Sequence, residues 1–320
     1  MNFFTFAALL KMMDQARKKL IIGALAVSFS SILWGFDGIV FTPRLYNLQV
    51  SYVVFVLHLL PFVMMNFLFF KEYRHLKDFT LHDIIIFTLI ALFGGALGTI
   101  AIVKAIFLMN FSQLSIVVLL QKLQPIFAIL LAVIFLGEKT GRNFLLWATL
   151  AIVGGYFLTF GFSLPDLAVD RNTLYASLLA ILAAFSFGSS TVFSKMILGR
   201  YNFVTSTFYR FGFTAFIMFI IMLGFGDFGQ INATTRENWF FIALICLTTG
   251  SGTMFLYYYG LRHVKATTAT ISELMFPVSA VFFDYVFNKS ILSPIQWVSA
   301  AVIIYSIFKI NTAAERELKS

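Results

Sequence analysis

The sequence contains ten long apolar segments, separated by short connections that hold most of its polar residues. A helix of ~20 residues crosses the ~30 Å hydrocarbon core of a bilayer. Hydrophobic residues make up 60% of the chain and charged residues 12%, against ~25% charged residues in soluble proteins. We therefore predict an all-α integral membrane protein with ten transmembrane helices. The predicted spans are 20–42, 50–70, 84–107, 112–136, 143–163, 174–197, 203–225, 239–260, 265–287 and 293–311.

One of these segments occurs twice. The stretch Leu119–Lys139 returns about 152 residues later as Thr270–Lys289, with Pro125 matching Pro277. A repeat of this length, close to half of the chain, indicates a duplicated half rather than a short solenoid unit. Five spans per half is an odd number, so the sequence predicts two inverted five-helix repeats. That symmetry is typical of secondary transporters, whose site lies near the membrane midplane; the alternative is a duplicated structural membrane protein.

The charges of the connections predict the orientation. With the N-terminus inside, sixteen lysines and arginines lie in the cytoplasmic segments and four in the external ones. Cytoplasmic loops carry the excess of positive charge in membrane proteins, so both termini are expected in the cytoplasm. The net charge of +9 is then a topology signal, and binding to nucleic acid is not expected. We expect a multi-pass protein of a bacterial inner membrane, embedded in the lipid bilayer.

The spans also predict the domain organisation. The expected parts are a cytoplasmic prefix (1–19), a first repeat (20–163), an external linker (164–173), a second repeat (174–311) and a cytoplasmic tail (312–320). The apolar run Phe3–Leu10 is too short to span, and its basic cluster follows it, unlike that of a signal peptide. Met12 and Met13 are alternative starts to Met1. The sequence carries no signal for an oligomeric state.

Short motifs recur at matching places in the two halves. They are Trp34-Gly35 with Phe187-Gly188, Ala96–Thr99 with Gly250–Thr253, and Gln124-Pro125 followed by Gly137-Glu138. In this combination the chain resembles the EamA-like branch of the drug/metabolite transporter superfamily over nearly its whole length. The resemblance implies alternating-access transport of small organic solutes. The second half departs from the pattern, because the ninth span ends Phe287-Asn288-Lys289 where a Gly-Glu pair is usual.

Charged residues inside the predicted spans are candidates for a site. A charge at the bilayer centre costs ~2.5–3.5 kcal/mol on insertion scales, so such residues usually line a cavity and have partners. The six are Asp37, Lys104, Lys122, Arg210, Glu273 and Asp284. Depth along each span, at ~1.5 Å per residue, suggests that Glu273 pairs with Arg210. It also suggests that Asp37 or Asp284 pairs with Lys122 or Lys104.

Glu273 is the foremost candidate for function. It precedes Pro277 by one turn, and a proline inside a helix removes a backbone hydrogen bond. A carboxylate beside freed carbonyls could bind an ammonium group or take up a proton. Its counterparts before Pro125 are Gln121, Lys122 and Gln124. A carboxylate facing an ammonium suits an amino acid or a related amphiphilic solute, with export as the expected direction. The alternative is a strut in which Glu273 only neutralises Arg210.

Aromatic residues are weaker candidates, because most of the 41 phenylalanines must be packing residues. An aromatic wall that receives a ring or an ammonium could be formed by Trp34, Tyr257, Tyr258, Tyr259 and Phe276, and Trp34 and Phe276 are the stronger candidates among them. Tyr257 and Tyr258 fit interfacial anchors near the cytoplasmic face as well. His58 fits a packing role. The glycines Gly94 and Gly98 predict close helix contacts.

An enzyme is not expected. The histidines His58, His75, His82 and His263 lack the spacing of a metal-binding helix, and neither a Gly-x-Ser-x-Gly elbow nor a phosphate loop is present. No metal or cofactor is predicted, and the chain itself does not use ATP. A receptor or scaffold that keeps a transporter fold is the alternative function. A facilitator and a proton-coupled exchanger both fit; if Glu273 carries the proton, Glu273→Gln should abolish the dependence of transport on a pH gradient.

Overall fold

The computed structural model describes residues 3–108, 117, 120–163, 171–225, 227–289 and 291–317. All regular elements in this part of the chain are helical. The α-helices are α1 (Phe3–Val40), α2 (Val50–Phe69), α3 (Leu81–Ile90), α4 (Gly98–Leu108), α6 (Gln124–Leu136), α7 (Arg142–Phe160), α8 (Arg171–Leu198), α9 (Phe203–Phe225), α10 (Gln230–Ala233), α11 (Arg236–Ile245), α12 (Ser251–His263), α13 (Ala266–Ser272), α14 (Met275–Asn288) and α15 (Pro294–Glu317).

Within the described residues, nine helical segments are long and apolar enough to cross a membrane, and α6 is a shorter apolar helix. These ten segments match the ten predicted spans. The N-terminal part of the fourth predicted span, 112–136, lies largely outside the described residues, as do most of the predicted linker (164–173) and the last residues of the tail. The predicted prefix is continuous with the first span, because α1 begins at Phe3.

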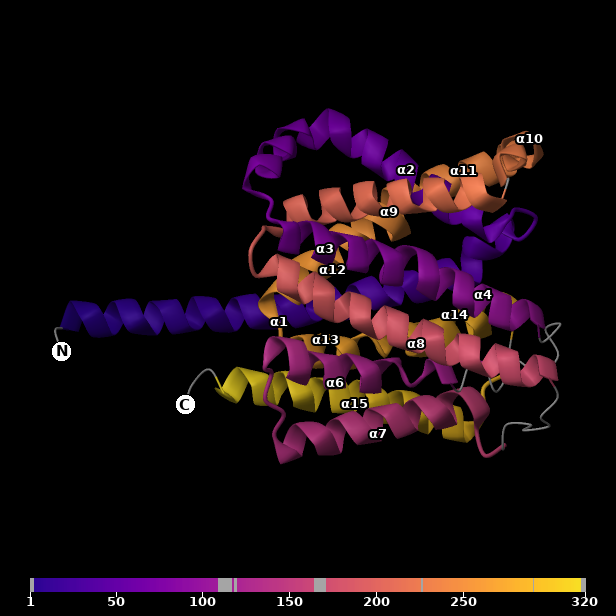
Figure 1. Cartoon of the computed structure of the whole chain (residues 1–320). Coiled ribbons are helices and arrows are strands. Elements are labelled where there is room, and N and C mark those ends of the chain that lie inside the picture. Colours follow the sequence, from indigo (N-terminus) through magenta and orange to yellow (C-terminus); the bar gives the residue numbers. More distant parts are fainter. Residues whose placement is uncertain are drawn as a thin grey trace.

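The helices of the two halves correspond in order and run in opposite directions along the bundle (Figure 1). Corresponding helices pack on each other in two places, α2 on α9 and α7 on α15. The remaining contacts exchange partners between the halves: α1 packs on α12 and α14, and α8 packs on α4 and α6. The first helix of each half therefore lies against the broken fourth span of the other half.

Glycines permit this exchange. A Cβ on Gly35 of α1 would lie 2.8 Å from the backbone oxygen of Phe276 and 2.9 Å from the nitrogen of Ala280 on α14. In the other half, a Cβ on Gly188 would lie 3.0 Å from the backbone of both Gln124 and Ala128 on α6. The glycine of each Trp-Gly or Phe-Gly motif is thus required for backbone contact between the halves.

Both halves contain a π-helical segment in the third span. These segments are Ala91–Leu97, between α3 and α4, and Cys246–Gly250, between α11 and α12. A single turn of π-helix is rare and often marks a functional site. The close contacts predicted for Gly94 and Gly98 are present, against Ser190 and Phe187 of α8. The change of helix type was not predicted.

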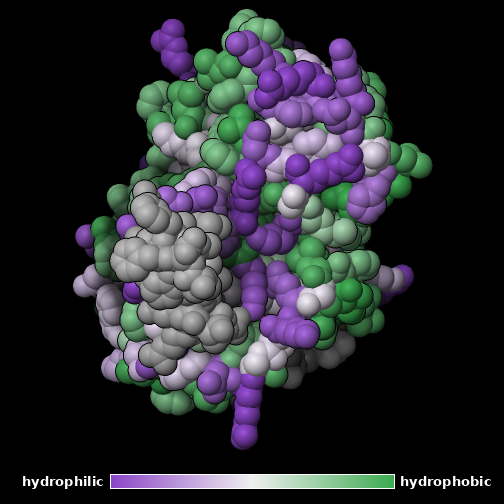
Figure 2. Space-filling view, turned by 90° about the vertical axis from the view of Figure 1, so that its left-hand side faces the viewer, coloured by the Kyte–Doolittle hydropathy of each residue, from purple (hydrophilic) through white to green (hydrophobic). Residues whose placement is uncertain are grey.

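Both termini lie at the same end of the bundle, here called the terminal face (Figure 1). Hydrophilic residues gather on this face, as Figure 2 shows. A buried carboxylate joins the two halves there: Asp83 of α3 receives Arg200 at 2.9 Å and the Tyr201 hydroxyl at 3.1 Å, both from the α8–α9 connection. Burial, together with the charge of Asp83, raises the pKa of Tyr201 to about 12, so its hydroxyl remains a donor to Asp83.

The opposite end of the bundle has the corresponding contact, but its ion pair, between Arg44 and Glu237 at 3.7 Å, is exposed and does not involve the capping residue. Asn238 of α11 occupies the position of Asp83, and each residue completes a capping box, with Thr235 and Thr80 respectively. Asn238 exchanges two amide hydrogen bonds of 3.0 Å with Asn47 of the α1–α2 connection. At both ends, the capping residue of a third span therefore contacts a connection of the other half, but a carboxylate makes the contact at one end and an amide at the other.

The Gly-Glu pair of the first half stabilises the second half. Glu138, just after α6, accepts hydrogen bonds from the backbone nitrogens of Ala266 (2.6 Å) and Thr267 (2.9 Å) and from the Thr267 hydroxyl (2.7 Å). These nitrogens begin α13, which has only seven residues. Because carboxylates are favourable at helix N-termini, Glu138 fixes the start of the broken span.

We expect Glu138→Gln to lower the free energy of unfolding by ~1–2 kcal/mol, since an amide replaces one of the two acceptor oxygens with a donor. Thermal unfolding of the purified protein in detergent would measure it. Lys139→Gln, at the neighbouring exposed residue, is the control and should change little. An unchanged melting temperature of the Glu138 variant would show that the cap contributes nothing to stability.

Lys289 stands at the position of Gly137. Both residues end their helices in the left-handed conformation, with φ of 59° for Lys289 and 63° for Gly137. This conformation suits glycine and costs ~1–2 kcal/mol in other residues. The second half therefore keeps the left-handed backbone of the first half although it lacks the glycine, and Lys289 is strained as a result.

Lys289→Gly should accordingly raise the free energy of unfolding by ~1 kcal/mol. Asn288→Gly is the matched control, because Asn288 is the last residue of α14 and a glycine there should destabilise by ~0.5–1 kcal/mol. Opposite signs for the two melting-temperature shifts are the expected result. A destabilised Lys289 variant would contradict the assignment of strain to this position.

Candidate functional site

A cavity of about 480 Å³ lies between the two halves and is lined by side chains from both. Its size falls within the ~300–1,000 Å³ typical of small-molecule sites. Ten of the residues that the sequence analysis singled out for the site line this cavity, whereas Lys104 and Asp284 do not. The ten are Trp34, Asp37, Gln121, Lys122, Gln124, Pro125, Arg210, Glu273, Phe276 and Pro277.

The two prolines mark interruptions in the helices. In the second half α13 ends at Ser272 and α14 begins at Met275, so Glu273 lies in the interruption. The Phe276 nitrogen bonds the Glu273 carbonyl at 2.9 Å, a tighter turn than that of an α-helix. The first half has the same interruption before Gln124, where α6 begins. The predicted loosening of the helix before each proline is confirmed, and it places polar side chains at the cavity wall.

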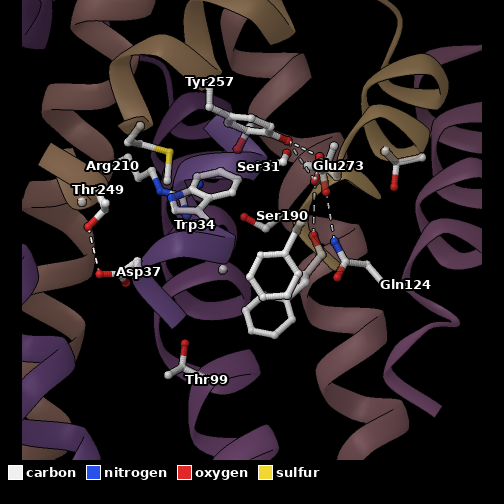
Figure 3. Close-up of a pocket in the computed structure, with 18 of the residues that line it drawn as sticks. Ser31, Trp34, Asp37, Thr99, Gln124, Ser190, Arg210, Thr249, Tyr257 and Glu273 are labelled. Atoms are coloured by element: carbon white, nitrogen blue, oxygen red, sulfur yellow. Dashed lines mark hydrogen bonds between the residues drawn. The ribbon is translucent and has the colours of Figure 1, made fainter. Parts of the chain in front are cut away.

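The carboxylate of Glu273 receives three side-chain donors from three other helices (Figure 3). Tyr257 of α12 donates at 2.6 Å, Gln124 of α6 at 3.1 Å and Thr191 of α8 at 3.3 Å. Charge-assisted hydrogen bonds are shorter and stronger than neutral ones. Glu273 therefore connects both halves at the cavity wall.

The predicted pairing of Glu273 with Arg210 is wrong. No ion pair joins them within the described part of the chain. Arg210 instead donates to the Tyr258 hydroxyl at 3.0 Å and lies 5.5 Å from the centre of that ring. Depth along the span placed both residues at a similar level, but the donors on α6, α8 and α12 reach Glu273 instead.

The other predicted pairs do not form either. Asp37 accepts hydrogen bonds from Thr249 (2.9 Å) and Thr42 (3.0 Å). Asp284 accepts one from Asn288 at 2.6 Å and does not line the cavity. Lys122 lines the cavity, and among the described residues it has no carboxylate within ion-pair distance.

The aromatic wall contains three of the five residues suggested by the sequence, because Tyr258 and Tyr259 do not line the cavity. Trp34 lies with its ring centre 5.2 Å from that of Tyr257, and Phe187 and Phe276 line the same cavity. The reading of Tyr257 and Tyr258 as interfacial anchors is wrong, because Tyr257 is 4% exposed and Tyr258 is fully buried. Tyr257 belongs to the site, and Tyr258 positions Arg210.

Sequence reasoning missed several small polar side chains of the cavity. They are Ser31, Thr99, Ser190, Thr191, Thr249 and Thr270. A signal for some of them was present: Ser31 precedes Trp34 by three residues, and Ser190 follows Phe187 by three. Residues at that spacing share a helix face, so each motif aromatic indicates the cavity face of its helix.

Comparison with known proteins agrees with this architecture. The family described as "EamA-like transporter family" matches twice, over residues 21–160 and 174–312. The riboflavin transporter ImpX of Fusobacterium nucleatum is 51% identical over 290 residues, covering 90% of this chain and 97% of that protein. The uncharacterized transporter sll1164 of Synechocystis is 24% identical over 281 residues, covering 83% and 78%.

A crystal structure of a protein with 14% sequence identity matches with a TM-score of 0.70, covering 93% of this chain and 99% of that one. At this identity the likeness shows the fold alone. The double family match and the transporter at 51% identity confirm the resemblance read from the motifs. The chain belongs to the EamA-like transporter family of multi-pass membrane proteins, and it is a transporter rather than an enzyme.

Proposed function

We propose that this protein transports riboflavin, or a closely similar flavin, through the cavity between its halves. Riboflavin combines a flat tricyclic ring, which has an apolar edge and a carbonyl-bearing edge, with a chain of hydroxyl groups. The observation that carries the proposal is the composition of the cavity, in which aromatic rings alternate with hydrogen-bonding side chains. The riboflavin transporter at 51% identity, matched over 97% of its length, supports this solute.

Alternating access is the proposed mechanism. The inverted halves exchange partners around the cavity, which supports a rocking of one half against the other. We place the terminal face in the cytoplasm of a bacterial inner membrane. The sixteen-to-four distribution of basic residues and the hydrophilic character of that face (Figure 2) support this orientation.

An amphiphilic amino acid is the second candidate solute. Lys122 and Glu273 line one cavity without pairing with each other, so a zwitterion would find a partner for each of its charges. The identity to a riboflavin transporter makes the flavin the first candidate. We further propose that the solute is exported and that its transport is coupled to protons through Glu273. The transport assay described next measures the effect of a pH gradient.

Counterflow in proteoliposomes tests the proposal. Vesicles loaded with riboflavin would be assayed for uptake of labelled riboflavin, and vesicles loaded with amino acids for uptake of labelled amino acids, each with and without a pH gradient. Exchange driven by internal riboflavin and absent from protein-free vesicles is the expected result. Exchange driven by amino acids alone would replace the flavin with the second candidate. No exchange by folded, inserted protein would contradict transport of either solute.

A matched pair of tryptophan variants localises the solute. Trp34 lines the cavity, whereas Trp147 of α7 packs against Tyr305 of α15, with ring centres 5.4 Å apart. Trp34→Leu should weaken riboflavin exchange, and Trp147→Leu should leave it near the wild-type rate. Equal exchange by both variants would place the solute path away from this cavity.

A further inference from the structure

Arg210 of α9 is a buried cation with a hydrogen-bond partner on one side. It is 8% exposed and lines the cavity. Its one hydrogen bond goes to the Tyr258 hydroxyl at 3.0 Å, and that hydroxyl shares a second hydrogen bond of 2.7 Å with Ser194. Tyr258 is itself fully buried. The guanidinium is therefore oriented by a fixed partner and retains further donors.

The charge of Glu273 acts on this guanidinium without contacting it. No carboxylate lies within ion-pair distance of Arg210 among the residues that the structure describes, and its Nε has no hydrogen-bond partner. A guanidinium carries five N–H donors, and a buried charge is costly unless acceptors satisfy it. A solute with acceptor oxygens would supply the missing partners.

The guanidinium of Arg210 is packed closely against α3–α4 on one side and faces the cavity on another. The π-helical segment brings the backbone of Gly94 so close that a Cβ there would lie 3.2 Å from an Nη of Arg210. Ser190 and His58 line the cavity with it. One ring nitrogen of His58, Nδ1, bonds the Val54 carbonyl at 2.8 Å, which leaves the other nitrogen available to a solute.

Figure 3 shows Arg210 on one side of the Trp34 ring and Glu273, with its partner Gln124, on the other. The carboxylate of Asp37 lies on the Arg210 side in this view, where it is already bonded to Thr249 and Thr42. The guanidinium and the Glu273 carboxylate thus belong to different parts of the cavity, and an aromatic ring lies between them in this view. A solute that carries carbonyl oxygens at one end and hydroxyl groups at the other would match both parts.

We propose that Arg210 binds the carbonyl oxygens of the flavin ring and so determines specificity for that ring. This assignment rests on the proposed transport of riboflavin. In it the pyrimidinedione edge of the ring accepts hydrogen bonds from the guanidinium, and the hydroxyl chain extends toward Glu273. Tyr258 is a positioning residue, because it holds the guanidinium without reaching the solute.

Two ligands separate recognition of the ring from recognition of the chain. Riboflavin and lumiflavin share the ring, but lumiflavin carries a methyl group in place of the hydroxyl chain. Quenching of flavin fluorescence by the purified full-length protein gives both dissociation constants. Arg210→Gln should weaken binding of the two ligands by the same factor, ~10- to 100-fold, because hydrogen bonds to a charged group are lost in each complex. Arg236→Gln, at an exposed arginine, is the control for loss of charge and should leave both constants unchanged.

Three outcomes would overturn parts of this assignment. Unchanged binding of both ligands by Arg210→Gln would remove Arg210 from the site. Weaker riboflavin binding with unchanged lumiflavin binding would assign the residue to the hydroxyl chain. If Arg210→Gln does not fold, Arg210→Lys decides by the same criteria, because an ammonium keeps the charge and loses the forked geometry. Wild-type protein that binds neither flavin would instead refute the proposed function.

Discussion

Gly35→Ala is expected to lower the free energy of unfolding by ~3 kcal/mol, the upper end of the range for an overpacked site. The added methyl group would lie within 3 Å of two backbone atoms of α14, the Phe276 oxygen and the Ala280 nitrogen. Backbone atoms cannot move aside as a flexible side chain can, so α1 and α14 must separate. Helix α1 carries Trp34, and α14 begins two residues after Glu273, so the change should also disturb the cavity. Thermal unfolding in detergent and riboflavin exchange would measure the two effects.

The same helix offers a matched control. Gly38 lies three residues further along α1, and a Cβ there would meet nothing within 4 Å. Gly38→Ala should be neutral or stabilising by up to ~1 kcal/mol, because alanine favours the helix over glycine. Gly188→Ala, with backbone contacts of 3.0 Å, should fall between the two. Equal stability of the Gly35 and Gly38 variants would mean that α1 and α14 can separate freely.

Glu273→Gln is expected to lower riboflavin transport at least ~10-fold, because three charge-assisted hydrogen bonds become neutral ones of about half the strength. The carboxylate is the common acceptor for Tyr257, Gln124 and Thr191. An amide presents one oxygen and one donor to the same three groups, so they must rearrange. Initial exchange rates in proteoliposomes, with and without a pH gradient, would measure the loss and any change in gradient dependence.

Asp37→Asn is the control in the same cavity. Asp37 has only two partners, the hydroxyl groups of Thr42 and Thr249, and a hydroxyl can donate or accept. The asparagine can therefore keep both contacts, and we expect a smaller loss of transport than for Glu273→Gln. A larger loss at Asp37 would reverse the assigned importance of the two carboxylates. Persistent gradient dependence in Glu273→Gln would exclude it as the proton site.

Much of the architecture followed from the apolar periodicity and the duplication. The spans, the two halves and the interruptions before Pro125 and Pro277 were predicted, because each depends on local sequence. Four of the six charges inside the spans line one cavity, as expected if such a charge is stable only in a polar environment, whereas Lys104 and Asp284 do not line it. Which helix each charge would face could not be predicted in the same way.

The failed pairings show the reason. Depth gives the position of Glu273 and Arg210 along their helices, but not the direction in which each side chain points. That direction depends on helix packing and on local changes of helix type, such as the segment Cys246–Gly250 that precedes Tyr257. Glu138 shows the same limit, because its motif was visible while its partners on α13 lie 128 residues away.

In the proposed alternating-access mechanism, the unequal contacts at the two ends of the bundle would affect the balance between access states. If the inverted halves were identical, the two open states would have equal energy, since the two-fold axis that relates the halves would convert one state into the other. Only positions at which the halves differ can make the two energies unequal. The contact of buried Asp83 with Arg200 at one end differs from the amide pair of Asn238 with Asn47, beside the exposed ion pair of Arg44 with Glu237, at the other. Salt screens exposed charges more than buried ones, so added salt should weaken the exposed ion pair more than the contact of Asp83 and so alter the resting preference of the carrier.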